Sequence, residues 1–197
     1  MIDLNNSEFA EKEIKIFNGG VAGAVPNVSL RVEKRKIEEP ETNPLFKVFF
    51  TDELGGEVNQ AWWSFTPNSQ KSDEQNKQLQ GYYISRLLHL ARAVMGKEYQ
   101  FPAVESVDEA LTLVMGLVND NAGGSKFNIF VNYGTTRKPS QYLSVRYFNF
   151  IEKNVEGAKI GLTPTNSDVM ERITEDQPDS NSESIVDQPV TDWTSLG

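Results

Sequence analysis

Residues 45–65 read LFKVFFTDELGGEVNQAWWSF and contain two runs of aromatic and β-branched side chains, one at 45–51 and one at 58–65. The stretch DELGG at 52–56 separates the two runs, and Pro67 follows the second one. Two such runs on either side of a glycine-containing turn predict an antiparallel β-hairpin. We therefore expect the first part of the chain to build a sheet.

A further strand is predicted before this hairpin, near residues 28–37. Side chains alternate there between apolar and polar, which is typical of a sheet with one covered face. The acidic, proline-containing stretch at 38–44 ends the strand. The apolar positions are Val28, Leu30 and Val32, and the polar ones are Ser29, Arg31 and Glu33.

Two helices are predicted after the hairpin. Ser72 and Gln75 have the spacing of a capping box, and Gly96 can end the first helix in the left-handed conformation. Ser106 and Glu109 repeat the capping pattern for a shorter helix that runs to about residue 118. Apolar residues recur at helical spacing in both segments: Leu79, Tyr83, Leu87, Leu90, Ala91 and Val94 in the first, and Leu111, Val114, Met115 and Val118 in the second.

Two last strands are predicted at 126–133 and 141–150, separated by residues 134–140. The order is therefore three strands, a helical insert and two strands, which predicts a mainly β fold of the α+β class. Five strands with helices between the third and fourth is the connectivity of the oligonucleotide-binding (OB) barrel. We expect a flexible N-terminal segment over 1–25, an OB-like nucleic-acid-binding domain over 26–155, and a disordered acidic tail over 156–197.

Charge is distributed unevenly along the 197 residues, whose net charge is −9. From residue 168 onward there are eight carboxylates and one arginine, a net charge of −7, so the remaining body carries about −2. A near-neutral body can still present a basic face. The chain has no cysteine, no signal-peptide pattern at its start and no apolar run of ~20 residues. These features favour a soluble, cytoplasmic protein without disulfides.

Catalytic patterns are weak. The single histidine, His89, lies in a helical segment, where a surface or core role is the simplest interpretation. The acidic pairs at 52–53 and 108–109 fall in a turn and at a helix start, where turn chemistry and the helix dipole explain them. The glycines at 19–23 lack the spacing and the lysine of a phosphate-binding loop. The sequence predicts no enzyme activity, no metal site and no cofactor.

Binding chemistry is better represented on the last predicted strand. Tyr142, Arg146 and Phe148 share one face of a strand that runs through 141–150. Stacking of a nucleobase on an aromatic ring is worth ~1–3 kcal/mol, so two or three such rings give useful affinity. The alternative is that Tyr142 and Phe148 pack beneath the helices while Arg146 extends past them to water.

Further candidates lie at the ends of strands. Trp62 and Trp63 place one indole on each face, so one is expected in the core and the other is exposed, covered by the helices or functional. The basic pairs Lys34-Arg35 and Arg137-Lys138 are expected to contact phosphates. Taken singly, each pair is better explained as part of a solvated surface, and it is their recurrence beside aromatic residues that favours binding.

Residues 130–146, FVNYGTTRKPSQYLSVR, resemble the late-strand region of OB-fold single-stranded DNA-binding proteins, particularly those of bacteriophages. The resemblance covers about 28–152. It implies a sequence-tolerant, phage-encoded protein that acts in DNA replication or recombination in the host cytoplasm. Bacterial members end in Asp-Asp-Ile-Pro-Phe, whereas this chain ends in VTDWTSLG at 190–197. That departure leaves open whether the tail has a partner.

The tail suggests a second contact surface. Apolar residues gather near its end, and Trp193 and Leu196 are predicted to anchor a replication protein. Its negative charge is expected to compete with nucleic acid for the basic face. An alternative function is a structural or assembly protein, such as a virion component. That function predicts a defined oligomer and no affinity for nucleic acid. A nuclease using scattered carboxylates is a third possibility.

Overall fold

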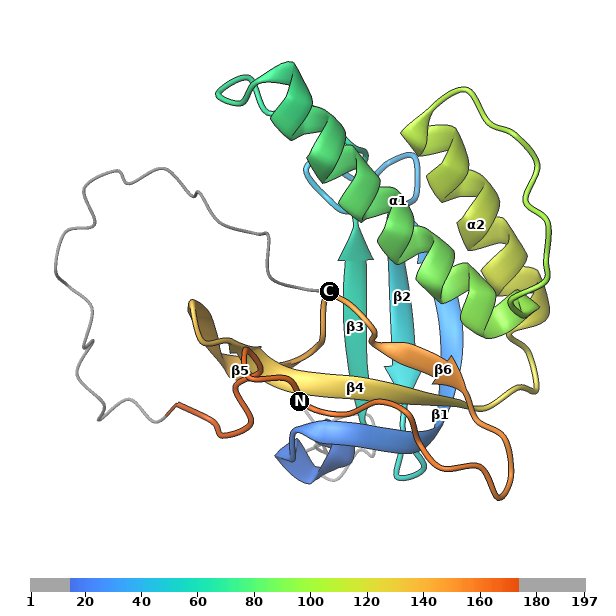
Figure 1. The fold of residues 1–197 in the computed structure, drawn as a ribbon. Helices are drawn as coiled ribbons and strands as arrows, with labels where there is room; N and C mark the ends of the chain where they lie inside the picture. Colours follow the sequence, from blue (N-terminus) through green and yellow to red (C-terminus); the bar gives the residue numbers. More distant parts are fainter. Residues whose placement is uncertain (1–14, 174–197) are drawn as a thin grey trace, which may run out of the picture.

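The structure is a computed structural model that describes residues 15–173 (Figure 1). Within this range it has a mixed α+β fold in which a six-stranded sheet packs against two helices. In chain order the elements are the 3-10 helix η2 (Phe17–Gly20), β1 (Gly23–Lys34), β2 (Phe46–Thr51), β3 (Glu57–Trp62), α1 (Asp73–Met95), α2 (Val107–Asn121), β4 (Phe127–Thr135), β5 (Lys138–Val145) and β6 (Ile151–Lys153).

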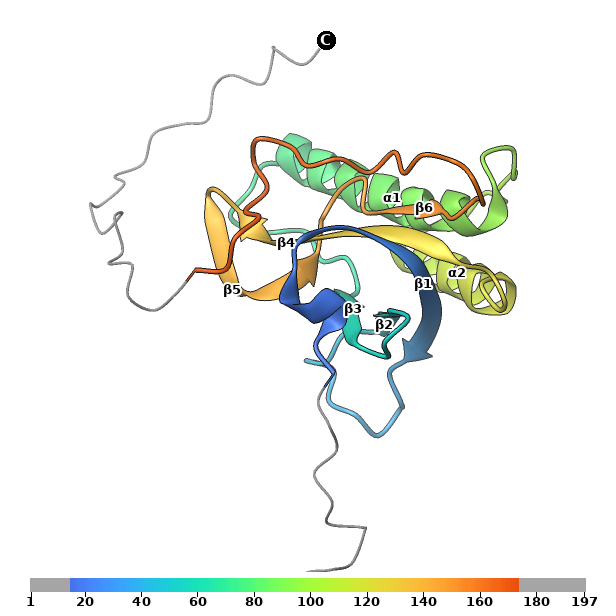
Figure 2. The same ribbon diagram turned by 90° about the horizontal axis from the view of Figure 1, so that it is seen from below.

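The sheet is antiparallel throughout, with strand order β3-β2-β1-β4-β5. The long strand β1 belongs to both halves, because its first part pairs with β4 and its second part pairs with β2. The register shifts between Val25 and Val28, where Asn27 has a φ of 59° and bends the strand. Figure 2 shows the resulting curve of β1 around the sheet.

Both helices begin where the sequence predicts. The Ser72 side chain accepts a hydrogen bond from Gln75 N, and the Gln75 side chain accepts one from Ser72 N, so the capping box is complete. Ser106 caps α2 through Glu109 N. The predicted apolar stripes supply Leu87 and Leu90 from α1, and Leu111 and Met115 from α2, to one core with the sheet.

The predicted closed barrel is not what the structure shows. Strands β3 and β5 approach each other, but no hydrogen-bonded ladder joins them within residues 15–173, so the sheet is open at this point. The coarser prediction, a mixed fold with helices between the third and fourth strands, is confirmed.

The β4–β5 connection is shorter than the predicted loop at 134–140. Thr135 pairs with Lys138, which leaves a turn of two residues. Gly134 makes this possible, because its φ is +83° and a Cβ at that position would lie 2.4 Å from Lys138 O. The last predicted strand also ends early, at Val145, and the chain forms β6 on the edge of β4 that β5 occupies.

The folded body is longer than the predicted domain of 26–155. At its start, Phe17 is buried and β1 already begins at residue 23. At its end, residues 154–173 return from β6 to the β4–β5 hairpin, as Figures 1 and 2 show. Tyr133 N donates to Val169 O (2.8 Å) and Thr136 N donates to Ser167 O (2.9 Å). The part of the predicted tail at 156–173 therefore lies on the body.

Membrane insertion by a helix finds no support in this fold. Neither α1 nor α2, the two α-helices of the described range, combines the length and the apolar character that crossing a bilayer requires.

Candidate nucleic-acid interface

Three large aromatic side chains form a half-exposed cluster on the outside of α1, which we call the aromatic patch. It consists of Tyr82 on α1, and Tyr147 and Phe148 in the segment between β5 and β6. Their exposed fractions are 45%, 46% and 45%. The ring centroids of Tyr82 and Phe148 are 6.0 Å apart, and those of Tyr147 and Phe148 are 4.6 Å apart, both edge to face. Such packing holds rings in place before any ligand arrives.

The local sequence explains why these rings face outward. The strand β5 ends at Val145, and Asn149 adopts a φ of 47°, so the chain turns sharply between them. The turn buries Phe150 and leaves Tyr147 and Phe148 on the surface. Asn149 suits this position because asparagine tolerates the left-handed region better than most residues.

A positive charge lies beneath the patch. The Arg86 guanidinium is 4.2 Å from the centre of the Tyr147 ring and 4.5 Å from that of Trp62. Burial lowers the pKa of Arg86, and the contact with Tyr147 opposes that decrease. Its Nε atom is buried without a hydrogen-bond partner, and no carboxylate of residues 15–173 is ion-paired with it. The half-buried charge is therefore not neutralised by the described protein.

One carboxylate, Asp108 on α2, acts electrostatically on Tyr83, the neighbour of Tyr82 in α1. Burial raises the pKa of Tyr83 well above its usual range, and Asp108 raises it further. Asp108 accepts a hydrogen bond from Phe65 N (3.0 Å), which orients it toward the segment after β3. A backbone amide thus holds Asp108, and no ion pair joins it to Arg86.

The structure separates the two adjacent tryptophans. Trp62 is 1% exposed and packs edge to face on Tyr83, with ring centroids 5.6 Å apart, so it belongs to the core. Trp63 is 51% exposed. The Tyr83 hydroxyl donates to Trp63 O (2.7 Å), which fixes the backbone of Trp63 beside α1. Of the pair, Trp63 is the one available to a ligand.

Arg146 is internal and does not share the surface of Tyr142 and Phe148. It is 8% exposed, and its guanidinium is 4.0 Å from the centre of the Phe130 ring. It donates to Phe148 O (2.8 Å) and to Thr163 O (2.8 Å), and also to Asn149 O. The shared face was predicted from a strand that continued to 150, whereas β5 ends before Arg146. Arg146 therefore holds the backbone of the aromatic patch in place from inside the protein.

The first predicted basic pair lies at the same end of the sheet as Trp63. Lys34 on β1, Phe46 on β2 and Trp62 on β3 are cross-strand neighbours. Lys34 is exposed, whereas Arg35 Nη1 donates to Glu41 O (2.9 Å) and Asn43 O (3.1 Å) and closes the β1–β2 loop. Lys34 is thus better placed for a phosphate than Arg35.

The second basic pair lies on a different element. Arg137 and Lys138 are exposed at the β4–β5 turn, and Figure 1 shows this hairpin projecting from the body on the side away from α2. Tyr142 lies on β5 and is 76% exposed. The structure leaves all three accessible, but it places none of them in the aromatic patch.

The outer face of β1, β2 and β3 offers a second aromatic–cation pair, but a weaker one. The Arg31 guanidinium lies 3.8 Å from the centre of the Phe49 ring. Arg31 is ion-paired with both Glu33 and Glu57, and these contacts raise the pKa of Arg31 against the opposing effect of burial. Its charge is therefore neutralised on the protein.

Sequence reasoning missed Tyr82, Tyr147 and Arg86. Tyr82 departs from the apolar period of α1, since the predicted stripe continues through Tyr83 instead. An aromatic residue on the polar flank of an amphipathic helix was the available signal. Alternation along the predicted strand placed Tyr147 on the face opposite Arg146 and Phe148, but the structure ends that strand at residue 145. The predicted tail anchors Trp193 and Leu196 lie outside the described residues.

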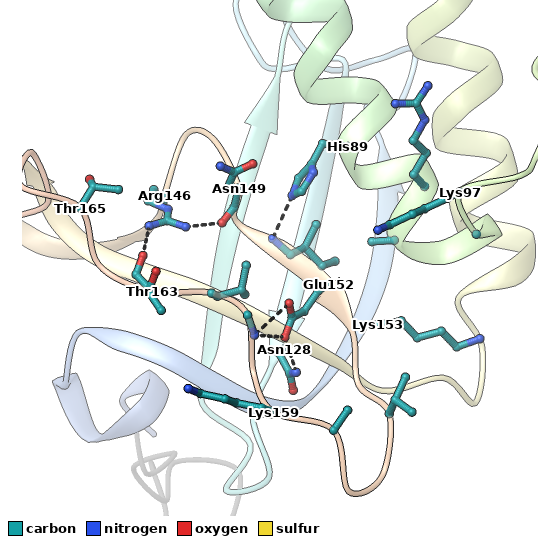
Figure 3. A pocket seen from close by; sticks show the side chains of 18 residues that line it. His89, Lys97, Asn128, Arg146, Asn149, Glu152, Lys153, Lys159, Thr163 and Thr165 are labelled. Carbon is teal, nitrogen blue, oxygen red and sulfur yellow. Dashed lines mark hydrogen bonds between the residues drawn. The ribbon is translucent and has the colours of Figure 1, made fainter. Parts of the chain in front are cut away.

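A cavity of about 840 Å³ opens at the other end of α1, between this helix, β6 and the segment at 155–165 (Figure 3). Ile151 N donates to Nε2 of His89 (3.4 Å), and Asn128 Nδ2 donates to Glu152 (2.9 Å). Four exposed cationic side chains line the cavity: Arg92, Lys97, Lys153 and Lys159. We refer to it as the basic cavity.

Residues 15–173 contain no cluster of three or more histidine, aspartate or glutamate side chains able to hold a metal ion. Comparison of the chain with protein families, with curated proteins and with solved structures finds no match.

Proposed function

We propose that the protein binds single-stranded DNA with little sequence preference, as a non-catalytic factor in replication or recombination. The observation that carries this proposal is the aromatic patch of Tyr82, Tyr147 and Phe148 above Arg86, a half-buried cation without an ion-pair partner among residues 15–173. A nucleotide supplies the two partners that such a surface can bind, a flat base to stack on its rings and an anion to pair with its cation.

The energetics favour this ligand. Each base stacked on an aromatic side chain contributes ~1–3 kcal/mol, and every base has a face that can stack. A positive charge in a partly buried site attracts an anion more strongly than one in open water. Trp63 extends the stacking surface beyond α1, and Lys34 adds a cation at the same end of the sheet.

We further infer that the sheet is an OB-type barrel that is open between β3 and β5. The placement of α1 and α2 between the third and fourth strands and the sharing of β1 by both halves support this inference. On such a barrel, Arg137, Lys138 and Tyr142 lie on the hairpin that flanks the ligand. We propose that they contact the strand after the bases have stacked.

A titration of labelled oligothymidylate tests the proposal. We expect binding at about 50 mM salt and a large loss of affinity at about 200 mM, because single strands release ~0.7 counterions per neutralised phosphate. A duplex of the same length serves as the control and should bind more weakly, because its bases are already stacked on each other. Absence of oligothymidylate binding at low salt would contradict the proposal.

A structural or assembly protein is the second candidate, and the same patch favours it. Tyrosine and phenylalanine are enriched in protein–protein interfaces, and a contiguous exposed apolar surface is typical of them. This function predicts a defined oligomer that buries Phe148, and no affinity for oligonucleotides. Light scattering of the purified protein, combined with the titration above, separates the two functions.

A further inference from the structure

The basic cavity lies on the same side of α1 as the aromatic patch. Tyr82, Arg86, His89 and Ala93 follow one another at spacings of four, three and four residues, so they form one stripe of the helix. The segment at 147–153 runs along this stripe. Tyr82 packs on Phe148 at one end, and Ala93 lines the cavity with Lys153 at the other.

Positive charge dominates the lining of the cavity. Its four surface cations come from three parts of the chain, with Arg92 and Lys97 at the end of α1, Lys153 on β6 and Lys159 in the segment that follows. In the part of the chain that the structure describes, none of these four is in an ion pair. Figure 3 shows the three lysines around the opening.

The one carboxylate in the lining is already engaged. Glu152 accepts hydrogen bonds from Asn128 Nδ2 (2.9 Å) and Gly161 N (3.0 Å). Arg146 also borders the cavity, but Asp168 neutralises it. In the described lining the four surface cations therefore outnumber the single negative charge of Glu152, which leaves the cavity with a net positive charge.

The wall between these cations also suits a nucleotide. Ile151 and Leu162 are buried apolar residues in the lining. Asn128 is 4% exposed, lines the cavity and has an Oδ1 atom without a hydrogen-bond partner. A nucleotide meets these needs together, because its base carries N–H donors for Oδ1 and its base and sugar can pack on the apolar wall while its phosphate faces the cations.

We propose that the basic cavity binds backbone phosphates of the same DNA strand whose bases stack on the aromatic patch, so that the strand runs along α1 toward its C-terminal end. This inference rests on the proposed function. Tyr82 and Ala93 are eleven residues apart in the helix, a distance of ~16 Å. At a spacing of ~3.4 Å between stacked nucleotides, the strand needs about five nucleotides to span it.

The test compares two charge-reversal variants of the full chain. Lys97→Glu/Lys159→Glu changes two cavity lysines, whereas Lys15→Glu/Arg172→Glu makes the same change in net charge at exposed positions outside the cavity. Thermal unfolding of both variants checks that they fold. Binding is measured with oligothymidylates of about three and about twelve nucleotides at several salt concentrations, since the shorter one is too short to span from patch to cavity.

We expect the cavity variant to bind the longer oligonucleotide at least ten-fold more weakly at low salt and to lose about 1.4 from the slope of log affinity against log salt, because ~0.7 is released per lost phosphate contact. Affinity for the shorter one should not change, and the control should match the wild type. Equal slopes for the cavity variant and the wild type, or equal weakening in the control, would overturn the inference while leaving the proposed function intact.

Two further results bear on the source of the phosphate. If thymidine monophosphate binds the wild type and loses its binding in the cavity variant, while the longer oligonucleotide keeps its affinity, the cavity is a site for free nucleotides and the inference is wrong. If the wild type binds neither oligonucleotide at low salt, the proposed function is wrong, and so is the inference about the cavity that rests on it.

Discussion

Arg146 and Asp168 form an almost fully buried ion pair, with 3.2 Å between Nη1 and Oδ2 and with side chains 9% and 2% exposed. Asp168 also accepts hydrogen bonds from Asn132 Nδ2 (2.7 Å) and Thr165 N (2.8 Å). Arg146 donates to Thr163 O from the other side. The pair therefore fastens the returning segment at 163–169 to the end of β5.

Replacement of Arg146 by alanine should destabilise the protein rather than remove a ligand contact. Breaking one side of a buried pair costs ~3–5 kcal/mol, because the remaining charge loses its partner. Denaturant unfolding followed by circular dichroism measures this loss. Arg172→Ala, an exposed arginine in the same segment, should change stability little. Unchanged stability of Arg146→Ala together with a loss of DNA affinity would show instead that Arg146 contacts the DNA.

The same pair predicts an acid-sensitive step. Burial alone would raise the pKa of Asp168, but hydrogen bonds from Thr165, Asn132 and Arg146 outweigh burial and hold the pKa below its usual value. This stabilisation is fully present above the pKa of an unfolded aspartate, about 3.9, and is lost as the pH falls through the lower folded value. Stability should thus fall more steeply below about pH 4 in the wild type than in Asp168→Asn. Parallel curves for the two proteins would show that Asp168 contributes nothing.

Local patterns in the sequence predicted the helices and strands better than the way in which the strands pair in the sheet. The capping residues Ser72 and Ser106 mark where helices begin because their hydrogen bonds are local, and both are found as expected. The two-residue turn between Thr135 and Lys138 was not predicted, because it depends on the close approach of Gly134 to Lys138 O. Long-range pairing of this kind has no local signature.

The same limit applies to the candidate site. Phe148 was predicted and is half exposed, and of the two tryptophans, between which the sequence did not decide, Trp63 is the exposed one. Arg146 was assigned to the surface of Phe148 by extending strand alternation beyond Val145. The chain turns there because Arg146 finds acceptors in a segment about twenty residues further on, which composition had assigned to the tail. Burial of an arginine by such a distant partner cannot be read from spacing.

The single histidine gives a second pH dependence that can be observed separately. Burial lowers the pKa of His89, and the charge of Arg146 lowers it further. The stability that the neutral ring provides is fully present above the pKa of an unfolded histidine, about 6.5, and is lost as the pH falls from there through the folded value. We expect the unfolding midpoint to fall as the pH drops below about 6.5 in the wild type and to stay level in His89→Gln. A decrease of the same size in the variant would exclude His89 as its source.

Phe148 offers a direct measurement of stacking on the aromatic patch. Phe148→Ala should weaken oligothymidylate binding by ~1–3 kcal/mol, the value of one stacked base. Phe148→Leu should weaken it nearly as much, because leucine keeps the apolar volume but has no ring face, and Phe148→Tyr should retain the affinity. Fluorescence anisotropy provides the binding curves. If leucine binds as well as phenylalanine, the patch contributes apolar contact and no stacking.

The two adjacent tryptophans should respond in opposite ways. Trp62 is buried, so Trp62→Ala should cost ~3–5 kcal/mol of unfolding free energy. Trp63 is half exposed, so Trp63→Ala should change stability by much less and should weaken DNA binding by ~1–3 kcal/mol.

In a Trp193→Phe background only these two indoles emit. Oligothymidylate should then quench the fluorescence of Trp62→Phe, which retains Trp63, and leave that of Trp63→Phe nearly unchanged. Quenching that persists in Trp63→Phe would contradict the prediction that the DNA strand binds at Trp63, beside the end of β3.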